Sequence, residues 1–238
     1  MQTIGLIGGM SWESTALYYR IINEYIKEKL RGLHSAKILM YSVDFAEIEY
    51  CQSLEQWDKS AEILTDAAKR LEIGGADFIV ICTNTMHKVA PQVEKNINIP
   101  ILHIADTTAA ELATSNIKKT ALLGTKYTMT QEFYKERIAA KGIDIVVPSD
   151  TEIEIVNGVI YDELCMGIVS EKSRAKFQKI ISRLKNEENA EAVILGCTEI
   201  GLLIKQSDSP LPVFDTTYIH AQAAAKKALF DEVKTNLQ

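Results

Sequence analysis

Short apolar segments alternate with longer amphipathic segments along this chain. Most of the short segments are continuous runs of Ile, Val, Leu and Ala that end at a glycine, an acid or a cysteine, as buried parallel strands do. The segments that we expect as strands are residues 3–7, 37–43, 76–81, 101–104, 119–124, 143–147, 192–196 and 213–215.

The longer segments carry apolar residues at helical spacing. In residues 14–31, for example, Leu17, Tyr18, Ile21 and Ile22 fall on one helical face. Helices are expected at residues 14–31, 57–73, 107–113, 130–141 and 172–187. Strands that alternate with helices predict an α/β protein with mostly parallel sheets flanked by helices.

The second half of the sequence repeats the first. Gly8 falls on Gly124 at an offset of 116 residues, and Cys82 falls on Cys197 at an offset of 115. Each cysteine follows a buried strand and precedes a threonine. A shared βα architecture explains the matching strands, whereas it does not explain the paired Cys-Thr dipeptides.

The duplication predicts two pseudo-symmetric lobes. We expect residues 1–105 plus 213–238 to form the N-terminal lobe and residues 106–212 to form the C-terminal lobe. Ligands of open α/β sheets bind beyond the carboxyl ends of the strands. We therefore expect the active site in the cleft between the lobes, with both cysteines in it.

Composition excludes several classes of protein. The 238 residues are 47% hydrophobic and 24% charged, with a net charge of −6, which is typical of a globular protein and unfavourable for binding nucleic acid or anionic membranes. No apolar run reaches the roughly 20 residues of a membrane helix. The opening MQTIGLIGG reads as strand and turn rather than a secretory signal, so a cytoplasmic protein with reduced thiols is expected.

The two Cys-Thr turns carry the candidate chemistry. Cys82 opens the run Cys-Thr-Asn-Thr, and Cys197 opens Cys-Thr-Glu. We expect each cysteine at a helix N-terminus, where backbone N–H groups and the helix dipole lower a thiol pKa. Cys51 and Cys165 have no such context and are interpreted as small apolar residues.

Two opposed bases of the same type suit the inversion of a carbon stereocentre. One group removes a proton from one face of the carbon, and the other returns a proton to the opposite face. The two roles exchange in the reverse direction, so a pair of similar groups is favoured. A pair of thiols meets this requirement if the site also stabilises the developing carbanion.

The residues around both cysteines resemble the aspartate/glutamate racemase family. Residues 79–88 (IVICTNTMHK) resemble its first signature, and residues 193–201 (VILGCTEIG) resemble the second. Residues 5–15 and 122–129 are also similar to the family, in its enterobacterial-type Asp/Glu or broad-specificity branch. The resemblance implies a two-lobed homodimeric enzyme that racemises amino acids without pyridoxal phosphate or any other cofactor.

The resemblance also implies roles for particular residues. Cys82 and Cys197 would be the two acid/base thiols. Residues expected to bind the amino-acid substrate are Met10, Ser11, Gln52, Thr83, Asn84, Thr85, Thr125, Thr128 and Thr198. Supporting roles are expected for Asp44, Tyr127 and Glu199. Glu199 could either tune Cys197 or cap a helix.

The sequence departs from the family where relatives hold the substrate's carboxylates. Archaeal-type aspartate racemases carry an Arg after the second strand and a Lys in a Tyr-Glu-x-x-Lys-x-Gly stretch. Here residues 43–49 (VDFAEIE) contain no Arg, and Cys165 takes the place of the Lys. Either Lys88 or Lys126 binds an acidic side chain, or the enzyme prefers less acidic amino acids.

Other functions stay open at this point. Hydantoin racemases and maleate isomerases share the two-cysteine architecture. A nucleotide-binding protein would use the glycine turn at Gly5–Gly9, although Asp44 lies 39 residues beyond Gly5 rather than the usual ~20. A thiol redox protein would pair the cysteines.

The remaining candidates are weaker. The four histidines show no metal-ligand spacing, so no metal site is expected, and His87 is interpreted as structural. Trp12 is expected as a lid over the cleft, as an interface residue or as a half-buried packing residue.

Overall fold

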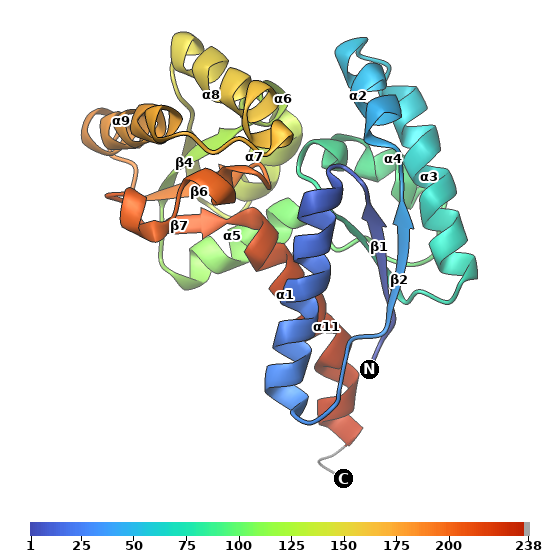
Figure 1. Cartoon of the computed structure of the whole chain (residues 1–238). Coiled ribbons are helices and arrows are strands. Elements are labelled where there is room, and N and C mark those ends of the chain that lie inside the picture. Colours follow the sequence, from blue (N-terminus) through green and yellow to red (C-terminus); the bar gives the residue numbers. More distant parts are fainter. Residues whose placement is uncertain (236–238) are drawn as a thin grey trace. The chain divides into compact units, whose positions relative to one another are not determined.

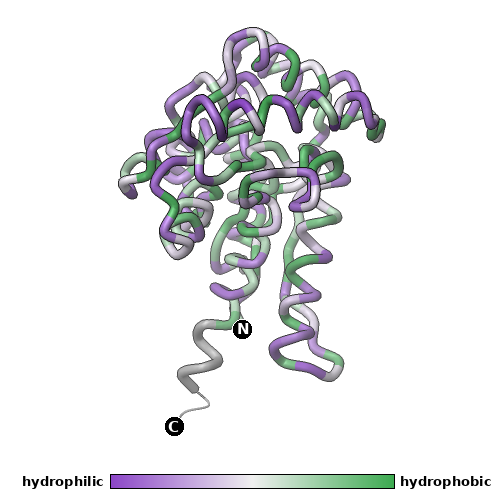
Figure 2. Tube along the Cα trace, turned by 90° about the vertical axis from the view of Figure 1, so that its left-hand side faces the viewer, coloured by the Kyte–Doolittle hydropathy of each residue, from purple (hydrophilic) through white to green (hydrophobic). Residues whose placement is uncertain are grey.

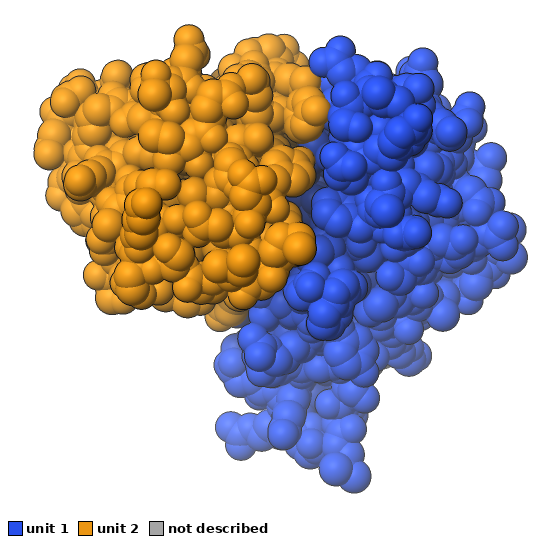
Figure 3. Space-filling model, turned by 45° about the horizontal axis from the view of Figure 1, so that its top comes forward, with its two compact units in different colours: residues 1–104, 220–238 blue, residues 105–219 orange. Residues whose placement is uncertain are grey.

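A computed structural model describes residues 1–235 of the chain, which divide into two compact units (Figure 3). The first unit contains Met1–Ile104 and the chain from His220 onward, and the second is Ala105–Ile219. From the sequence, residues 213–219 were expected in the first lobe. The structure places them in the second unit because the strand at 213–215 pairs with the strand at 192–196.

The first unit is built on a parallel sheet in the order β2-β1-β3, of which β1 and β2 are labelled in Figure 1. Its strands are β1 (Ile4–Gly8), β2 (Ile38–Ser42) and β3 (Phe78–Ile81). Ile101 adds a single parallel bridge to Ile79. The expected strand at 101–104 is therefore wrong beyond this bridge, because a helix already begins at Ile104.

Helices cover both faces of this sheet. They are α1 (Trp12–Leu30), α2 (Phe45–Ser53), α3 (Trp57–Ile73), the 3-10 helix η1 (Thr85–Val89), α4 (Ala90–Glu94) and α11 (Thr216–Thr235). Alternate strand residues point to opposite faces. Leu6 and Val80 pack against α1 and α11, whereas Ile7 and Ile79 pack against α3 and α4.

The second unit repeats this plan with one more strand. Its parallel sheet has the order β5-β4-β6-β7 and consists of β4 (Lys119–Gly124), β5 (Asp144–Val146), β6 (Ala192–Gly196) and β7 (Val213–Asp215). Its helices are α5 (Ile104–Thr114), α6 (Lys126–Thr130), α7 (Glu132–Ala139), α8 (Asp150–Asp162), η2 (Leu164–Met166), α9 (Glu171–Glu188), α10 (Ile200–Leu203) and η3 (Gln206–Asp208). The predicted α/β class with two parallel sheets is confirmed.

Several helices begin or end at other residues than expected from the sequence, because hydrogen bonds at the helix ends set these boundaries. Helix α1 begins at Trp12 because the Ser11 side chain accepts a hydrogen bond from the Ser14 N–H. The helix expected at 130–141 is split at Gln131, whose extended backbone separates α6 from α7. Helix α8 was not expected, although Ser149 and Glu152 form a capping box that signals its start.

Hydropathy follows the amphipathic pattern of each helix, seen as alternating purple and green bands (Figure 2). Across residues 1–235, no helix combines the length and apolar character required to cross a bilayer.

Candidate active site

Two turns of the first unit are brought together by the pairing of β1 with β3. Ile7 is in register with Ile81, so both strands end at the same edge of the sheet. Gly9 leaves β1 with φ +93°, and a Cβ there would lie 2.2 Å from the Val43 carbonyl oxygen. Only glycine allows this turn, which leads directly into the buried pair Met10 and Ser11.

The start of α1 contacts Cys82 directly. Ser14 Oγ donates to the Ser11 carbonyl oxygen at 3.0 Å and lies 3.4 Å from the Cys82 carbonyl oxygen, another acceptor. The Cys82 N–H donates to the Ile7 carbonyl at 2.9 Å. Ser14 thus connects the Ser11 turn to the Cys82 backbone, and Met10 is buried beside Ser11 in the same turn. Ser14 was not among the expected residues, although its position three residues after an N-cap serine was a usable signal.

The Cys82 thiol is fully buried. Its Sγ lies 3.9 Å from the Val80 carbonyl oxygen. Burial raises the pKa of this thiol well above its usual range. The expectation of a lowered pKa is wrong for this conformation, because Cys82 leads into the 3-10 helix η1 rather than into an α-helix, and desolvation dominates.

The polar residues that follow Cys82 lie in the same turn. Asn84 and Thr85 are buried, and Thr83 is partly exposed. The Thr83 carbonyl accepts a hydrogen bond from the His87 ring at 2.7 Å. Hydroxyl and amide groups here are suitable donors for a carboxylate.

The second unit forms the equivalent turns at the ends of β4 and β6, where Gly124 is in register with Gly196. The Thr125 hydroxyl caps α6 by accepting from the Thr128 N–H at 3.3 Å. Both threonines are buried, and Tyr127 beside them is partly buried. The Thr128 methyl group lies 3.3 Å from the place that a Gly196 Cβ would occupy, so Thr128 packs onto the strand end that carries Cys197.

Cys197 has a carboxylate partner. Its Sγ lies 3.1 Å from Glu199 Oε2, and the Thr198 hydroxyl donates to the same oxygen at 2.5 Å. Burial, followed by the Glu199 charge and the neighbouring Cys165, raises the pKa of the Cys197 thiol well above its usual range. Here too the expected lowering is wrong. Glu199 occupies the N-cap position of α10 without a side-chain capping bond, and its carboxylate contacts Cys197 and Thr198.

The other candidates lie further from the cysteines along the chain. Gln52 is buried within α2. Asp44 is exposed and caps α2 through the Ala46 N–H at 3.0 Å. Trp12 is 69% exposed at the start of α1, so it is not a packing residue of its own unit.

The two lysines considered for an acidic substrate already have partners. Lys126 Nζ lies 2.5 Å from Glu154 Oε1 on the surface. Lys88 Nζ lies 3.9 Å from the centre of the Trp57 ring, and partial burial lowers its pKa.

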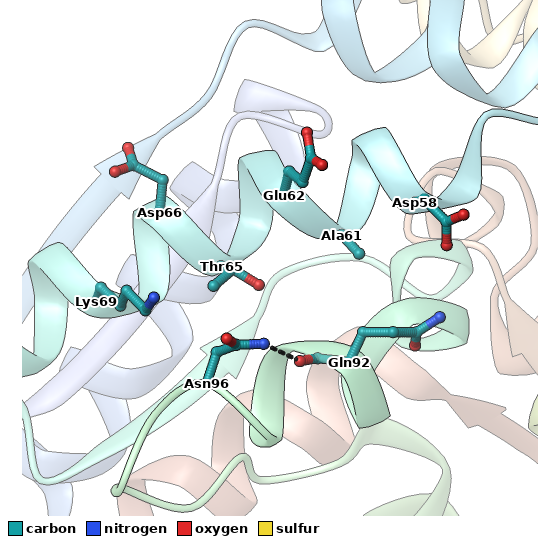
Figure 4. Close-up of a pocket in the computed structure, with 8 residues that line it drawn as sticks. All are labelled: Asp58, Ala61, Glu62, Thr65, Asp66, Lys69, Gln92 and Asn96. Carbon is teal, nitrogen blue, oxygen red and sulfur yellow. Dashed lines mark hydrogen bonds between the residues drawn. The ribbon is translucent and has the colours of Figure 1, made fainter.

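A surface pocket of about 450 Å³ lies between α3 and α4 (Figure 4). It is lined by Asp58, Ala61, Glu62, Thr65, Asp66, Lys69, Gln92 and Asn96. None of these is a candidate residue of the sequence, and the pocket contains neither Cys82 nor Cys197. This groove is therefore separate from both Cys-Thr turns.

Comparison with known proteins decides the family. Residues 7–224 match the family described as Asp/Glu/Hydantoin racemase. The chain belongs to this family. It is 25% identical over 232 residues to the broad specificity amino-acid racemase RacX of Bacillus subtilis (strain 168), a match that covers 95% of this chain and 98% of RacX.

Solved structures of family members agree. An assigned Asp/Glu racemase of Yersinia pestis is 53% identical, with a TM-score of 0.90 over 96% of this chain and 100% of that one. An aspartate racemase homologue of Pyrococcus horikoshii is 38% identical, with a TM-score of 0.84 over 96% of this chain and 99% of that one. Membership of the Asp/Glu/hydantoin racemase family makes this chain an isomerase of the racemase type.

Proposed function

We propose that this racemase-family chain interconverts the L and D enantiomers of an amino acid without a cofactor, with Cys82 and Cys197 as its two acid/base groups. One observation carries the proposal. The parallel sheets β2-β1-β3 and β5-β4-β6-β7 correspond over three strands. In each unit a Cys-Thr pair follows the equivalent strand, which is β3 beside β1 in the first unit and β6 beside β4 in the second.

The proposed reaction needs only proton transfers. A thiolate takes the proton from the substrate Cα and becomes a thiol, leaving a carbanion. The second thiol donates its proton to the opposite face of that carbon and becomes a thiolate. The product is the other enantiomer, and the two cysteines have exchanged protonation states. The enzyme is then ready for the reverse reaction without any other reagent.

Glu199 supports the first of these steps. Burial keeps both thiols protonated at neutral pH, so one of them has to lose its proton before it can act as a base. The Glu199 carboxylate, 3.1 Å from Cys197 Sγ, is an acceptor already in place. Cys82 Sγ instead lies 3.9 Å from the Val80 carbonyl oxygen, so it is suited to be the proton donor in the direction that starts from the Cys197 thiolate.

The polar side chains of the strand-end turns would hold the substrate carboxylate. Hydrogen bonds to this carboxylate stabilise the negative charge that spreads onto it from the carbanion. Donors proposed for this role are Ser11, Thr83, Asn84, Thr85, Thr125, Thr128 and Thr198. Met10 and Gln52 would shape the surroundings, with Asp44 and Tyr127 in supporting roles.

Aspartate and glutamate are the first substrates to test. A second candidate, a preference for less acidic amino acids, is favoured by the partners of Lys88 and Lys126 and by the residues near Cys197. Cys165 packs against the cluster that contains Cys197. Such surroundings suit an apolar or neutral side chain better than a second carboxylate.

The deciding experiment follows Cα–H exchange. Purified protein without added cofactor is incubated in deuterated buffer with L-Asp, L-Glu and several neutral amino acids. Proton NMR follows the loss of each Cα–H signal, and a chiral assay identifies the product. We expect exchange together with inversion for at least one amino acid. No exchange across the panel would reject amino-acid racemisation, and hydantoins and maleate would then be tested.

The proposal includes a cytoplasmic homodimer, as the resemblance implies. Light scattering coupled to size-exclusion chromatography should give a mass of two chains. A monomeric mass would reject the dimer without affecting the proposed chemistry.

A further inference from the structure

A cluster of aromatic polar side chains is buried in the first unit beside the Cys82 turn. It comprises His87, His103, His220 and Tyr18, all of them buried. The His87 ring centre lies 4.5 Å from that of His103 and 5.6 Å from that of His220. Buried polar groups of this kind are retained at a cost in desolvation, so their hydrogen-bond partners indicate what they do.

His87 holds the turn that follows Cys82 at two points. Its Nδ1 lies 2.7 Å from the Thr83 carbonyl oxygen, so Nδ1 carries the proton and donates it. Its backbone N–H donates to the Asn84 carbonyl at 3.1 Å. One residue thus holds both carbonyl groups of the dipeptide that follows the proposed acid/base cysteine.

The second ring nitrogen fixes the tautomer of His87. Nε2 accepts a hydrogen bond from the Ile104 N–H at 3.2 Å, so this nitrogen carries a lone pair and the ring is neutral. Both nitrogens are occupied by protein groups. Among residues 1–235 no group of His, Cys, Asp or Glu side chains is arranged to hold a metal ion, so the cluster is not a metal site.

His220 and Tyr18 hold the surroundings of His87 in place. His220 Nε2 donates to the Leu102 carbonyl at 2.7 Å, and its Nδ1 accepts from the Tyr18 hydroxyl at 2.8 Å. These bonds connect α11, α1 and the segment before α5. The His87 ring is therefore packed against a network whose own hydrogen bonds are satisfied.

The bond to Thr83 has a consequence for the other side of the same peptide. In a trans peptide the C=O of one residue and the N–H of the next point in opposite directions. Because His87 holds the Thr83 C=O, the Asn84 N–H is directed away from His87. A fixed N–H beside a reacting thiol is the kind of donor that stabilises charge developing on a carboxylate.

We propose that His87 is a positioning residue of this racemase: by holding the Thr83 carbonyl it aims the Asn84 N–H at the substrate carboxylate. The substrate in this inference comes from the proposed function, whereas the hydrogen bonds of His87 do not depend on it. From the sequence alone His87 was interpreted as structural, and the two interpretations differ in what the ring's two nitrogens contribute to catalysis.

Two substitutions separate the roles of the two nitrogens. In His87→Asn the side-chain NH₂ lies near the position of Nδ1 and can still donate to Thr83. In His87→Gln the longer amide reaches the position of Nε2, so it can bind Ile104 and loses Thr83. Both variants remove the ring and its packing, so they are matched for the structural cost.

We expect kcat/KM to fall about tenfold or more in His87→Gln, the cost of one lost hydrogen bond of about 1.4 kcal/mol. Most of this loss should be in kcat, because the carboxylate gains charge only as the carbanion forms. His87→Asn should retain activity within about threefold of wild type at a similar loss of Tm. Equal losses in the two variants, in proportion to their Tm, would overturn the proposal.

A second measurement does not depend on activity. The rate of iodoacetamide labelling at Cys82 is read by peptide mass spectrometry, with the buried Cys51 of the same unit as internal reference. If His87 holds the turn, the Cys82/Cys51 ratio should rise about threefold or more in His87→Gln and stay near wild type in His87→Asn. An unchanged ratio in both variants would overturn the positioning role. Absence of exchange by wild-type protein would instead reject the proposed function.

Discussion

Cys82 and Cys197 occupy equivalent places in the two units and have different surroundings. Cys82 is completely buried in the apolar cluster of the first unit, and its thiol lies 3.9 Å from the Val80 carbonyl oxygen. Cys197 is 8% exposed, and its thiol lies 3.1 Å from the Glu199 carboxylate. The residue two positions after the cysteine makes the difference, since it is Asn84 in the first unit and Glu199 in the second.

The comparison shows that a repeated fold need not repeat the surroundings of an equivalent side chain. Burial raises the pKa of both thiols, so neither is a thiolate simply because of its place at a strand end. Cys197 has the Glu199 carboxylate beside it, which can accept its proton. The two units therefore repeat the strand-end position with an amide after one cysteine and a carboxylate after the other, a difference that the proposed mechanism assigns to the proton donor and the base.

The largest expected effect comes from removing either thiol. Cys82→Ala and Cys197→Ala should each lower the rate of racemisation by about 10³-fold or more, because inversion needs both groups. Exchange of the Cα proton needs only one base, so each variant should keep residual exchange with one enantiomer. Chiral assay and NMR in deuterated buffer measure the two rates.

Cys51→Ala is the matched control for these variants. Cys51 is buried in α2 of the first unit and is not part of the proposed chemistry. We expect it to keep wild-type activity. Full racemisation by either Cys82→Ala or Cys197→Ala would contradict the two-thiol mechanism.

Replacing Glu199 tests whether the carboxylate beside Cys197 makes its role differ from that of Cys82. Glu199→Gln removes the proton acceptor of Cys197, and kcat should fall about 10- to 100-fold. The substitution also removes a charge that raises the pKa of Cys197, so the remaining activity should begin to rise at lower pH than in wild type. Asn84→Ala, in the equivalent place, should reduce the rate without moving the pH profile. A profile unmoved by Glu199→Gln would show that the carboxylate does not act on Cys197.

Buried His220 of the first unit should make the protein less stable as the pH falls. Burial lowers the pKa of His220 to about 4, below the ~6.5 of an unfolded chain. Between pH 4 and pH 6.5 the unfolded state binds more protons than the folded state. The contribution of neutral His220 to the free energy of unfolding is therefore fully present above pH 6.5 and is lost as the pH falls toward 4. The contribution is up to about 3 kcal/mol. Denaturant unfolding from pH 7 to pH 4 measures it.

His220→Gln keeps a donor for the Leu102 carbonyl and cannot be protonated. Its stability should be lower than that of wild type at pH 7 and should decline less between pH 6.5 and pH 4. A decline parallel to that of wild type would place the acid sensitivity elsewhere.

The smallest effects are expected at the two lysines. Lys126→Ala breaks an exposed ion pair with Glu154, and Lys88→Ala removes the contact with Trp57. If neither lysine binds an acidic side chain, the KM for aspartate and glutamate should change by less than about twofold. A large rise in KM for these two substrates alone would identify the lysine concerned as the missing cation.

Local patterns in the sequence were sufficient for much of the fold. Continuous apolar runs predicted β1, β3, β4 and β6, because a strand buried on both faces has to be apolar throughout. Such patterns were less reliable for edge strands and for helices with few buried residues. The expected strand at 101–104 is reduced to a bridge at Ile101, and α2 was not recognised because only three of its nine residues are buried.

The sequence by itself determined the α/β class, the duplication and the identity of the candidate residues, since these depend on residue type and spacing. Only the tertiary structure decided their environments. The direction of each thiol pKa, the partner of Glu199 and the contact of His87 with Thr83 depend on burial and on atoms distant in the chain or on turn geometry. Desolvation and hydrogen bonding act over a few ångströms in space, and spacing along a sequence does not specify those distances.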